Sequence, residues 1–437
     1  MIRHGHAVQF ADGKETIVPL WHLDSISRRP MSTKDCGEAL RAELDRAVKA
    51  QLRRRQGPPA CQLSSGRDSS AVATSAALVL RDSGENLIAL TGAPNERFAG
   101  PTITDRLADE SALAAVTASR HPNMSHLVCR SRPRPIGTEL RELSELHFGP
   151  ITNLGALHWA AEVHEAASAS GASILLSGSN GNFSISASGI SHLIDVFREQ
   201  GLRSWLRHAI RIGDLSPSHW QTIGSVSLGP FLPESLYKRI LEFAGRETAS
   251  DFKVPVLRQP YRERAESLLR DQYADARPPR SYHHFRRDML LRRDNAEKMS
   301  LAMDGVDVRD PTGDRRLIEL CLTFPPDQLV SEQWAPSQAY ESAFGDRIPP
   351  EVLYNRNRGY QGADWLDLFP KDEVEQLFGK LRRNYLVDEM FDFAYIDGLL
   401  RSWPARGTPY LSSLVTYRTD LLNALAMADY IDLHFPN

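Results

Sequence analysis

The first 180 residues alternate between short apolar runs and segments with helical spacing. Leu40, Leu44, Val48 and Leu52 recur every four residues, which predicts one apolar face of a helix that starts near Ser32–Asp35. After the breaking segment RRRQGPP, apolar runs typical of buried strands alternate with helical patterns. The predicted strands are 60–63, 87–91, 125–129 and 173–177, and the predicted helices are 69–81, 107–119 and 156–169.

Strands that alternate with helices predict an α/β fold whose parallel sheet is covered on both faces. Beyond Gly189 the pattern becomes mainly helical, with proline-rich interruptions, so we expect a largely helical C-terminal half that covers one side of the sheet. The first 30 residues are strand-like and irregular. The length of 437 residues suits either two domains or one large α/β unit with a helical extension.

Composition excludes several classes of protein. The formal net charge is −3, which gives no reason to expect nucleic-acid binding. No apolar run approaches the roughly 20 residues that span a bilayer, and the N-terminus lacks the apolar core of a secretory signal. The four cysteines are far apart in the sequence, which is typical of reduced thiols in a cytoplasmic protein.

The most informative segment is SSGRDSS, residues 64–70, which follows the first predicted strand and enters a helix. In parallel sheets ligands bind beyond the carboxyl ends of the strands, and hydroxyls, backbone N–H groups and a helix N-terminus suit a phosphate. Asp68 would repel that phosphate unless a divalent cation lies between them. The alternative is an ordinary strand-to-helix turn in which Ser or Asp caps the helix.

Three motifs in the same order resemble the synthetase domain of the asparagine synthetase and β-lactam synthetase family. LSSGRDSS resembles the pyrophosphate loop S-G-G-x-D-S, and residues 297–329 and 344–365 resemble the two conserved segments that follow it there. The resemblance implies the sheet of PP-loop ATP pyrophosphatases, which is the adenine nucleotide α-hydrolase-like fold. We expect residues 1–35 to be a remnant of a glutaminase-like domain with a linker, and 36–437 to be the amide-forming domain.

The resemblance also implies a site for ATP and Mg²⁺. Asp68 and Asn182 are the predicted metal ligands, and Arg356, Arg358 and Asp307 are the predicted catalytic residues. Adenine is expected near the ends of two strands. The predicted nucleotide-binding residues are Leu63, Ser64, Ser65, Gly66, Asp68, Ser69, Ser70, Leu90, Thr91, Ser177 and Gly178.

The chain departs from the family pattern at several positions. Asn182 stands where the family has a magnesium-binding Asp, and Ser179 stands where asparagine synthetases carry an acid near the acceptor. Asn357 occupies the position of the catalytic Lys, and its Arg neighbours bind phosphate but do not accept a proton. Asp109 and Glu110 match an acidic pair of the family, although first-turn helix residues are the plainer interpretation.

Residue 2 is Ile, where asparagine synthetases have a glutaminase cysteine, so we expect the acceptor amine to be free ammonia or part of the substrate. The resemblance is greatest to lasso peptide cyclases, which join an Asp or Glu side chain to the peptide's own N-terminus. The expected partners are a precursor peptide, and with it a leader-recognising protein and a companion protease. The alternatives are an ammonia-dependent ligase for a small molecule and a non-catalytic homologue that only binds nucleotide or peptide.

Overall fold

A computed structural model gives the structure of the chain. It describes residues 5–100, 103, 105–146, 149–212, 217–243, 253–272, 277–291, 299–332, 334–405 and 414–437. Among these residues no helix is both long enough and apolar enough to cross a membrane.

The centre of the fold is a five-stranded parallel sheet in the order β6-β4-β3-β7-β8. This arrangement confirms the predicted α/β class, with the first predicted strand, β3, in the middle of the sheet. The strands are β3 (Ala60–Gln62), β4 (Leu87–Ala93), β6 (Met124–Arg130), β7 (Ile174–Leu176) and β8 (Asp307–Arg309).

Both faces of the sheet are buried, as the apolar runs predict. Cys61 and Leu176 belong to the large cluster on one face, whereas Ala60 and Leu175 pack on the other. The first face is covered by α1 (Thr33–Gln51), α2 (Arg67–Arg81), α3 (Ser111–Ser119), α12 (Arg315–Thr323) and α13 (Gln338–Phe344). The second face is covered by α5 (Leu157–Ala169) and α11 (Met299–Asp304).

Helix α1 shows why the local sequence folds as it does. Ser32 and Asp35 form a reciprocal capping box at its start, which satisfies backbone N–H groups that have no partner within the helix. Leu40, Leu44 and Val48 are fully buried, so the predicted apolar face is confirmed.

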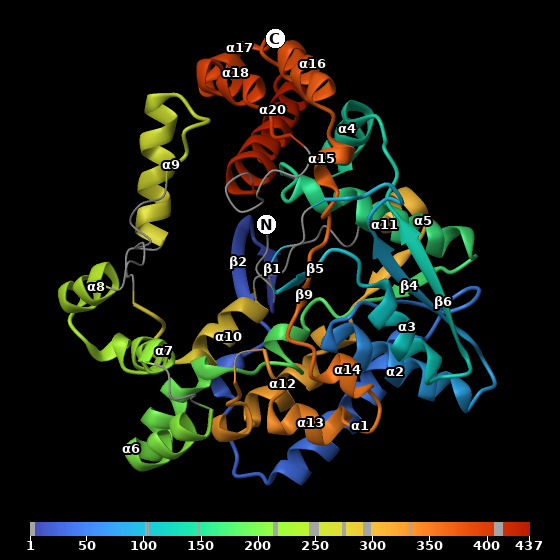
Figure 1. The fold of residues 1–437 in the computed structure, drawn as a ribbon, viewed down its shortest axis with the longest axis vertical. Coiled ribbons are helices and arrows are strands. Elements are labelled where there is room, and N and C mark those ends of the chain that lie inside the picture. Colours follow the sequence, from blue (N-terminus) through green and yellow to red (C-terminus); the bar gives the residue numbers. More distant parts are fainter. Residues whose placement is uncertain are drawn as a thin grey trace.

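A second hydrophobic cluster lies among the C-terminal helices, which form the upper part of Figure 1. There α4 (Ile136–Leu146) packs against α20 (Leu422–His434) and α16 (Lys371–Leu381). The other elements of this part are α15 (Trp365–Leu368), α17 (Tyr385–Met390), α18 (Phe393–Arg401) and a π-helical segment at Leu414–Leu421. Helix α14 (Pro350–Leu353) instead packs against α3, in the cluster on the first face of the sheet.

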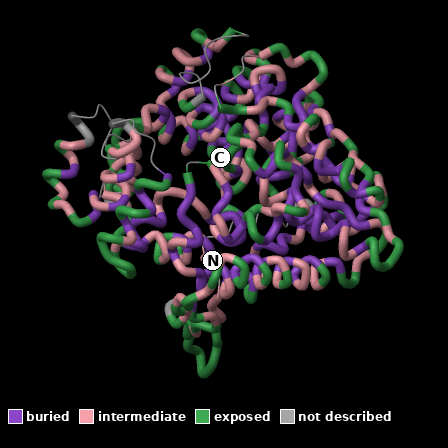
Figure 2. Tube along the Cα trace, turned by 60° about the horizontal axis from the view of Figure 1, so that its bottom comes forward, coloured by how far each residue is buried: buried purple, intermediate pink, exposed green. Residues whose placement is uncertain are grey.

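Further helices lie to one side of the sheet (Figure 1). They are α6 (Leu193–Ile212), α7 (Pro217–Ser227), α8 (Glu234–Phe243), α9 (Gln259–Gln272) and α10 (Tyr282–Leu290). Near the N-terminus β1 (His6–Ala11) and β2 (Lys14–Pro19) form an antiparallel hairpin, which is largely exposed in Figure 2. The predicted division between residues 1–35 and 36–437 falls in the first turn of α1 and stays a prediction.

The two-stranded sheet of β5 (Arg106–Leu107) and β9 (Arg358–Gly359), strand β8 and helix α4 differ from the sequence pattern. Strand β8 lies in the half that was predicted to be helical, because its three residues pair with β7 as an edge strand and are too few to give a periodic signal. Helix α4 was not predicted either. The four cysteines are free and buried.

Candidate functional site

A cavity of about 540 Å³ opens at the carboxyl end of β3 and β4. Its walls are formed by the loop between β3 and α2, the end of β4, helix α5 and the segment 352–361. We call it the loop cavity. Its position is the one expected for a ligand in a parallel sheet, because the strand ends and helix N-termini point to the same edge.

Hydrogen bonds within the loop between β3 and α2 fix its conformation at the carboxyl end of β3. The Ser64 hydroxyl accepts the Gly66 N–H at 3.0 Å and lies 2.8 Å from the Ser69 hydroxyl, which accepts the Ser64 N–H at 3.0 Å. The Thr91 hydroxyl donates to the Leu63 carbonyl at 2.6 Å and so joins the loop to β4. Gly66 caps the 15-residue helix α2, whose N-terminal N–H groups form an anion site.

Asp68 lies in the first turn of α2, and its Oδ1 is buried without a hydrogen-bond partner. Burial raises the pKa of Asp68 to about 6, against the opposing effects of the Ser186 side chain and the guanidinium groups of Arg67 and Arg358. A Cβ atom at Gly181 would overlap this carboxyl group, so only glycine admits the loop that follows β7 so close to it. The buried, unpartnered oxygen needs a cation or a proton.

The donor set fits magnesium. Asp68 and Asn182 line the same cavity and supply oxygen atoms, which Mg²⁺ prefers. Within the residues that the structure describes, no group of three or more His, Cys, Asp or Glu side chains is gathered for a metal ion. Mg²⁺ does not need such a group, since it is commonly bound by one or two carboxylates together with substrate phosphates.

Basic side chains face the loop from the opposite segment. Arg356 and Arg358 line the cavity from this segment. Arg67, at the start of α2, and Arg106 line it too and were not among the predicted site residues. The Arg358 guanidinium lies 3.3 Å from the ring centroid of Trp334, and Arg356 pairs with Glu332 at 2.8 Å. Asn357, at the position of the family's Lys, also lines the cavity. Four guanidinium groups in one cavity favour a polyphosphate.

Glu110 connects the two sides of the cavity. Its Oε1 accepts the N–H and the hydroxyl of Ser65, at 3.1 Å and 2.6 Å, and it is only 5% exposed. A Cβ at Gly359 would overlap the Glu110 carboxyl group, so glycine is required where β9 (Arg358–Gly359) passes it. In the sequence, the only indication of Glu110 was its match, with Asp109, to an acidic pair of the family. Asp109 does not line the cavity.

Most predicted site residues meet at the loop cavity. Ser70 and Ser177 are buried and do not line it, and the Ser70 hydroxyl instead donates to the Gly66 carbonyl at 2.8 Å. The predicted residues that line it are Leu63, Ser64, Ser65, Gly66, Asp68, Ser69, Leu90, Thr91, Gly178, Asn182, Arg356 and Arg358.

The structure does not bring Asp307 to this cavity. Asp307 is the first residue of β8, opposite Ile174, and therefore lies at the amino end of the sheet, where it accepts a 2.7 Å hydrogen bond from Arg309 Nε. Strands rise about 3.3 Å per residue, so Asp310 reaches the carboxyl end about 10 Å further on. There Asp310 accepts the Asn180 N–H at 2.9 Å and holds the loop that carries Asn182.

Comparison with known proteins agrees with this geometry. The family model described as asparagine synthase matches residues 39–427, which is most of the chain and includes both sides of the loop cavity. No curated protein matches the chain.

Proposed function

Because the chain belongs to the asparagine synthase family, whose members are ATP-dependent ligases, we propose that it closes a macrolactam ring in a peptide. In this reaction a peptide carboxylate is activated by ATP and then joined to an amine of the same peptide, as in lasso peptide cyclases. The observation that carries the ATP-dependent step is the buried, unpartnered Oδ1 of Asp68 beside the serine-rich loop.

The side chains around the loop cavity have distinct roles in binding ATP. The N–H groups of the loop and of α2 would hold the pyrophosphate portion, and Arg356 and Arg358 would bind phosphoryl oxygens. Asp68 and Asn182 would hold Mg²⁺, which when bound neutralises charge on the pyrophosphate. Leu90, Thr91 and Gly178 would border the adenosine at the strand ends.

The chemistry balances without a further reactant. A carboxylate oxygen of the peptide attacks the α-phosphorus of ATP, and the bond to the β-phosphate breaks with loss of pyrophosphate. The peptide amine then attacks the activated carbonyl carbon, its proton is lost and AMP leaves. Well-oriented groups in one molecule reach effective molarities of about 10⁵ M or more, so holding both ends of one peptide replaces a bimolecular encounter.

Two features of the acceptor side support a peptide over a small amino acid. Ser179, which lines the loop cavity, replaces the acid that asparagine synthetases carry near the acceptor. The residues around it in SGSNGNFSISASG are mostly small, which leaves room for a larger substrate.

The test is a reconstituted reaction of the protein with ATP, magnesium, the precursor peptide and its companion protease. We expect AMP and a core peptide that is lighter by one water in mass spectrometry. Acetylation of the new N-terminus should stop ring closure and still permit pyrophosphate release. Full turnover with ammonia or free aspartate in the absence of peptide would replace this proposal with a small-molecule ligase.

One observation favours a second candidate, a homologue that binds nucleotide or peptide without chemistry. Asn182 and Asn357 line the cavity where the family has a metal-binding carboxylate and a catalytic Lys. The same reaction separates the two, because a non-catalytic homologue binds ATP and releases no pyrophosphate at any peptide concentration.

A further inference from the structure

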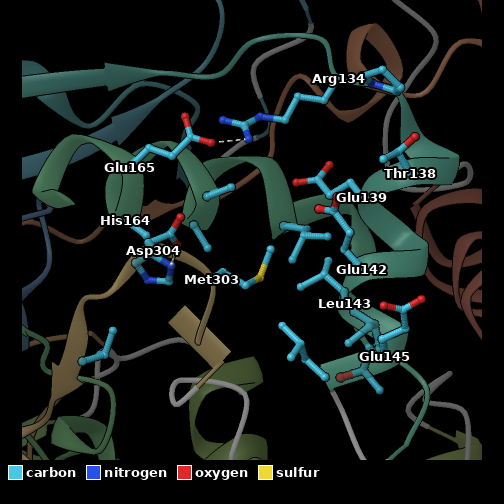
Figure 3. Close-up of a pocket in the computed structure, with 18 of the residues that line it drawn as sticks. Arg134, Thr138, Glu139, Glu142, Leu143, Glu145, His164, Glu165, Met303 and Asp304 are labelled. Atoms are coloured by element: carbon cyan, nitrogen blue, oxygen red, sulfur yellow. Dashed lines mark hydrogen bonds and ion pairs between the residues drawn. The ribbon is translucent and has the colours of Figure 1, made fainter. Parts of the chain in front are cut away.

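A second cavity, of about 840 Å³, adjoins the loop cavity. Gln62, at the end of β3, and Ala160, on α5, line both cavities, so the two share a wall. Its other walls come from α4, α5 and α11, and Figure 3 shows side chains of all three around one space. We call it the acidic cavity.

Its lining combines apolar surface with an excess of carboxylates. Leu143, Ile151, Leu157 and Val308 form part of the apolar surface, and Met303 lies between α4 and α5 in Figure 3. Among the residues that the structure describes, five carboxylates and a single arginine line the same space, which is the reverse of the loop cavity. The carboxylates belong to Glu139, Glu142, Glu145, Glu165 and Asp304.

The basic groups near the acidic cavity offset only one of these carboxylates. Arg134 and Arg132 bind Glu165 at 2.5 Å and 2.8 Å, and both arginines also bind Glu162. The two arginines are therefore shared by these two glutamates and leave the charge of the other carboxylates in place. His164 Nδ1 lies 4.0 Å from Asp304, but burial lowers the pKa of this histidine to about 4, and it is neutral at physiological pH.

On α4 the carboxylates face a partly buried space. Glu139 and Glu142 project from α4 toward the side on which His164 and Asp304 lie (Figure 3). Burial raises the pKa of Glu139 to about 7 and raises that of Asp304, so both carboxylates are costly to ionise in the empty cavity. A bound cation would remove this cost, because an opposite charge favours the ionised form of a carboxyl group.

We propose that the acidic cavity binds the amine-bearing end of the substrate, as an ammonium group next to an apolar side chain. The assignment of this ligand to the substrate rests on the proposed function, which needs an amine beside the ATP site. The neighbouring cavities then divide the two reactants by charge: polyphosphate among arginines, ammonium among carboxylates. An anionic ligand would meet the excess of carboxylates, and a purely polar one would leave the apolar surface uncovered.

Calorimetric titration with three dipeptide amides tests the proposal. Leucyl-leucinamide carries an α-ammonium, N-acetyl-leucyl-lysinamide carries a side-chain ammonium, and N-acetyl-leucyl-leucinamide is neutral. We expect leucyl-leucinamide to bind about tenfold more tightly than the neutral compound. Equal binding of these two, or binding of the lysine compound alone, overturns the proposal.

Variants locate the binding. Glu142 and Glu145 are exposed on α4, so Glu142→Gln together with Glu145→Gln should leave the fold intact and weaken leucyl-leucinamide about tenfold. Ala161→Phe, which fills only the acidic cavity, should weaken it as well, whereas Glu375→Gln, an exposed change on α16, should not. Unchanged affinity in both cavity variants refutes the site.

ATP binding separates this proposal from the proposed function. The Kd for ATP with magnesium, measured in the same way, should change by less than about twofold in the α4 double variant, because these glutamates do not line the loop cavity. If the unmodified protein does not bind ATP with magnesium, the proposed ligase function is refuted. Dipeptide binding in that case would still report on the acidic cavity.

Discussion

At the scale of single residues, Asp68 combines a cost to folding with a functional role. Its carboxyl group is held against Gly181 with one oxygen buried and unpartnered, an arrangement that does not stabilise the empty protein. Such a group is retained for what it binds. The sequence motif pointed to this residue, and the structure adds the reason why its pKa is raised.

We expect Asp68→Asn to lower the rate of pyrophosphate release by about 100-fold or more, because the magnesium ligand is lost. The same change should stabilise the fold. The folded-state pKa of Asp68 is about 6, against 3.8 for an unperturbed Asp. Ionisation of Asp68 therefore destabilises the fold progressively between about pH 4 and pH 6, and the full cost is present above about pH 6. Urea unfolding should therefore show the variant about 1–2 kcal/mol more stable at pH 7.5 and equal to wild type near pH 3.5. A variant less stable at pH 7.5 would contradict this account.

Asn182→Asp should tighten the apparent magnesium affinity of ATP-dependent pyrophosphate release by about tenfold, because a carboxylate binds Mg²⁺ better than an amide. Asn355→Asp is the matched control, since it adds the same charge to another wall of the loop cavity. If both variants change the magnesium dependence equally, the effect is general electrostatics and Asn182 is not a ligand.

At the scale of elements, the start of α3 fixes the relation between the loop and the arginine-bearing strand. Glu110 precedes α3 (Ser111–Ser119), bonds Ser65 on one side and contacts Gly359 of β9 on the other. Burial raises the pKa of Glu110, so its position is maintained at an energetic cost. We infer that it is a positioning residue for the phosphate-binding groups.

Glu110→Ala should raise the KM for ATP about tenfold and lower the free energy of unfolding by about 1–3 kcal/mol, because two buried donors of Ser65 lose their acceptor. Glu110→Gln keeps an acceptor oxygen and should restore much of the KM, which a purely electrostatic role would not allow. Asp109→Ala, at the half-exposed neighbour, should change the KM by less than about twofold.

The length of each element explains which strands hydrophobic periodicity predicts and which it does not. The strands from 60 to 177 and helices α2, α3 and α5 were predicted because each is apolar enough to give a pattern. Strand β8 is three residues long and becomes a strand only through its pairing with β7, so the sequence could not place Asp307 at the amino end and Asp310 at the carboxyl end of the sheet.

At the scale of the whole molecule, Asp364 joins the C-terminal helical part to the carboxyl edge of the sheet. It precedes α15, is 1% exposed and accepts the Asn95 N–H at 2.8 Å and the Trp159 Nε1–H at 2.9 Å, with a further hydrogen bond from Ser131. Asn95 and Ser131 follow β4 and β6, so a residue of the C-terminal helical part organises the carboxyl edge of the sheet.

Asp364→Ala should lower the free energy of unfolding by about 2–4 kcal/mol, because it leaves several buried donors unpaired. The KM for ATP should rise as well, since Trp159 lines the loop cavity and loses its hydrogen bond. Urea unfolding and pyrophosphate release measure the two effects. The exposed Asp372→Ala on α16 should cost less than about 1 kcal/mol, and an equal loss in both variants would show that Asp364 is not special.

The sequence by itself determined the elements and chemistry that are local: the strands of the sheet up to residue 177 with helices α1, α2, α3 and α5, the serine-rich loop with Asp68, and the arginines near 357. These depend on periodicity and on residue types at short spacing. Tertiary structure alone decided that Ser70, Ser177 and Asp307 lie outside the cavity, that Glu110 and Asp310 support its loops, and that a second, acidic cavity adjoins it. Ser70 is held by a local bond to Gly66, but the other features depend on contacts between segments far apart in the sequence. The pairing of those segments is set by packing and strand register and leaves no trace in local sequence.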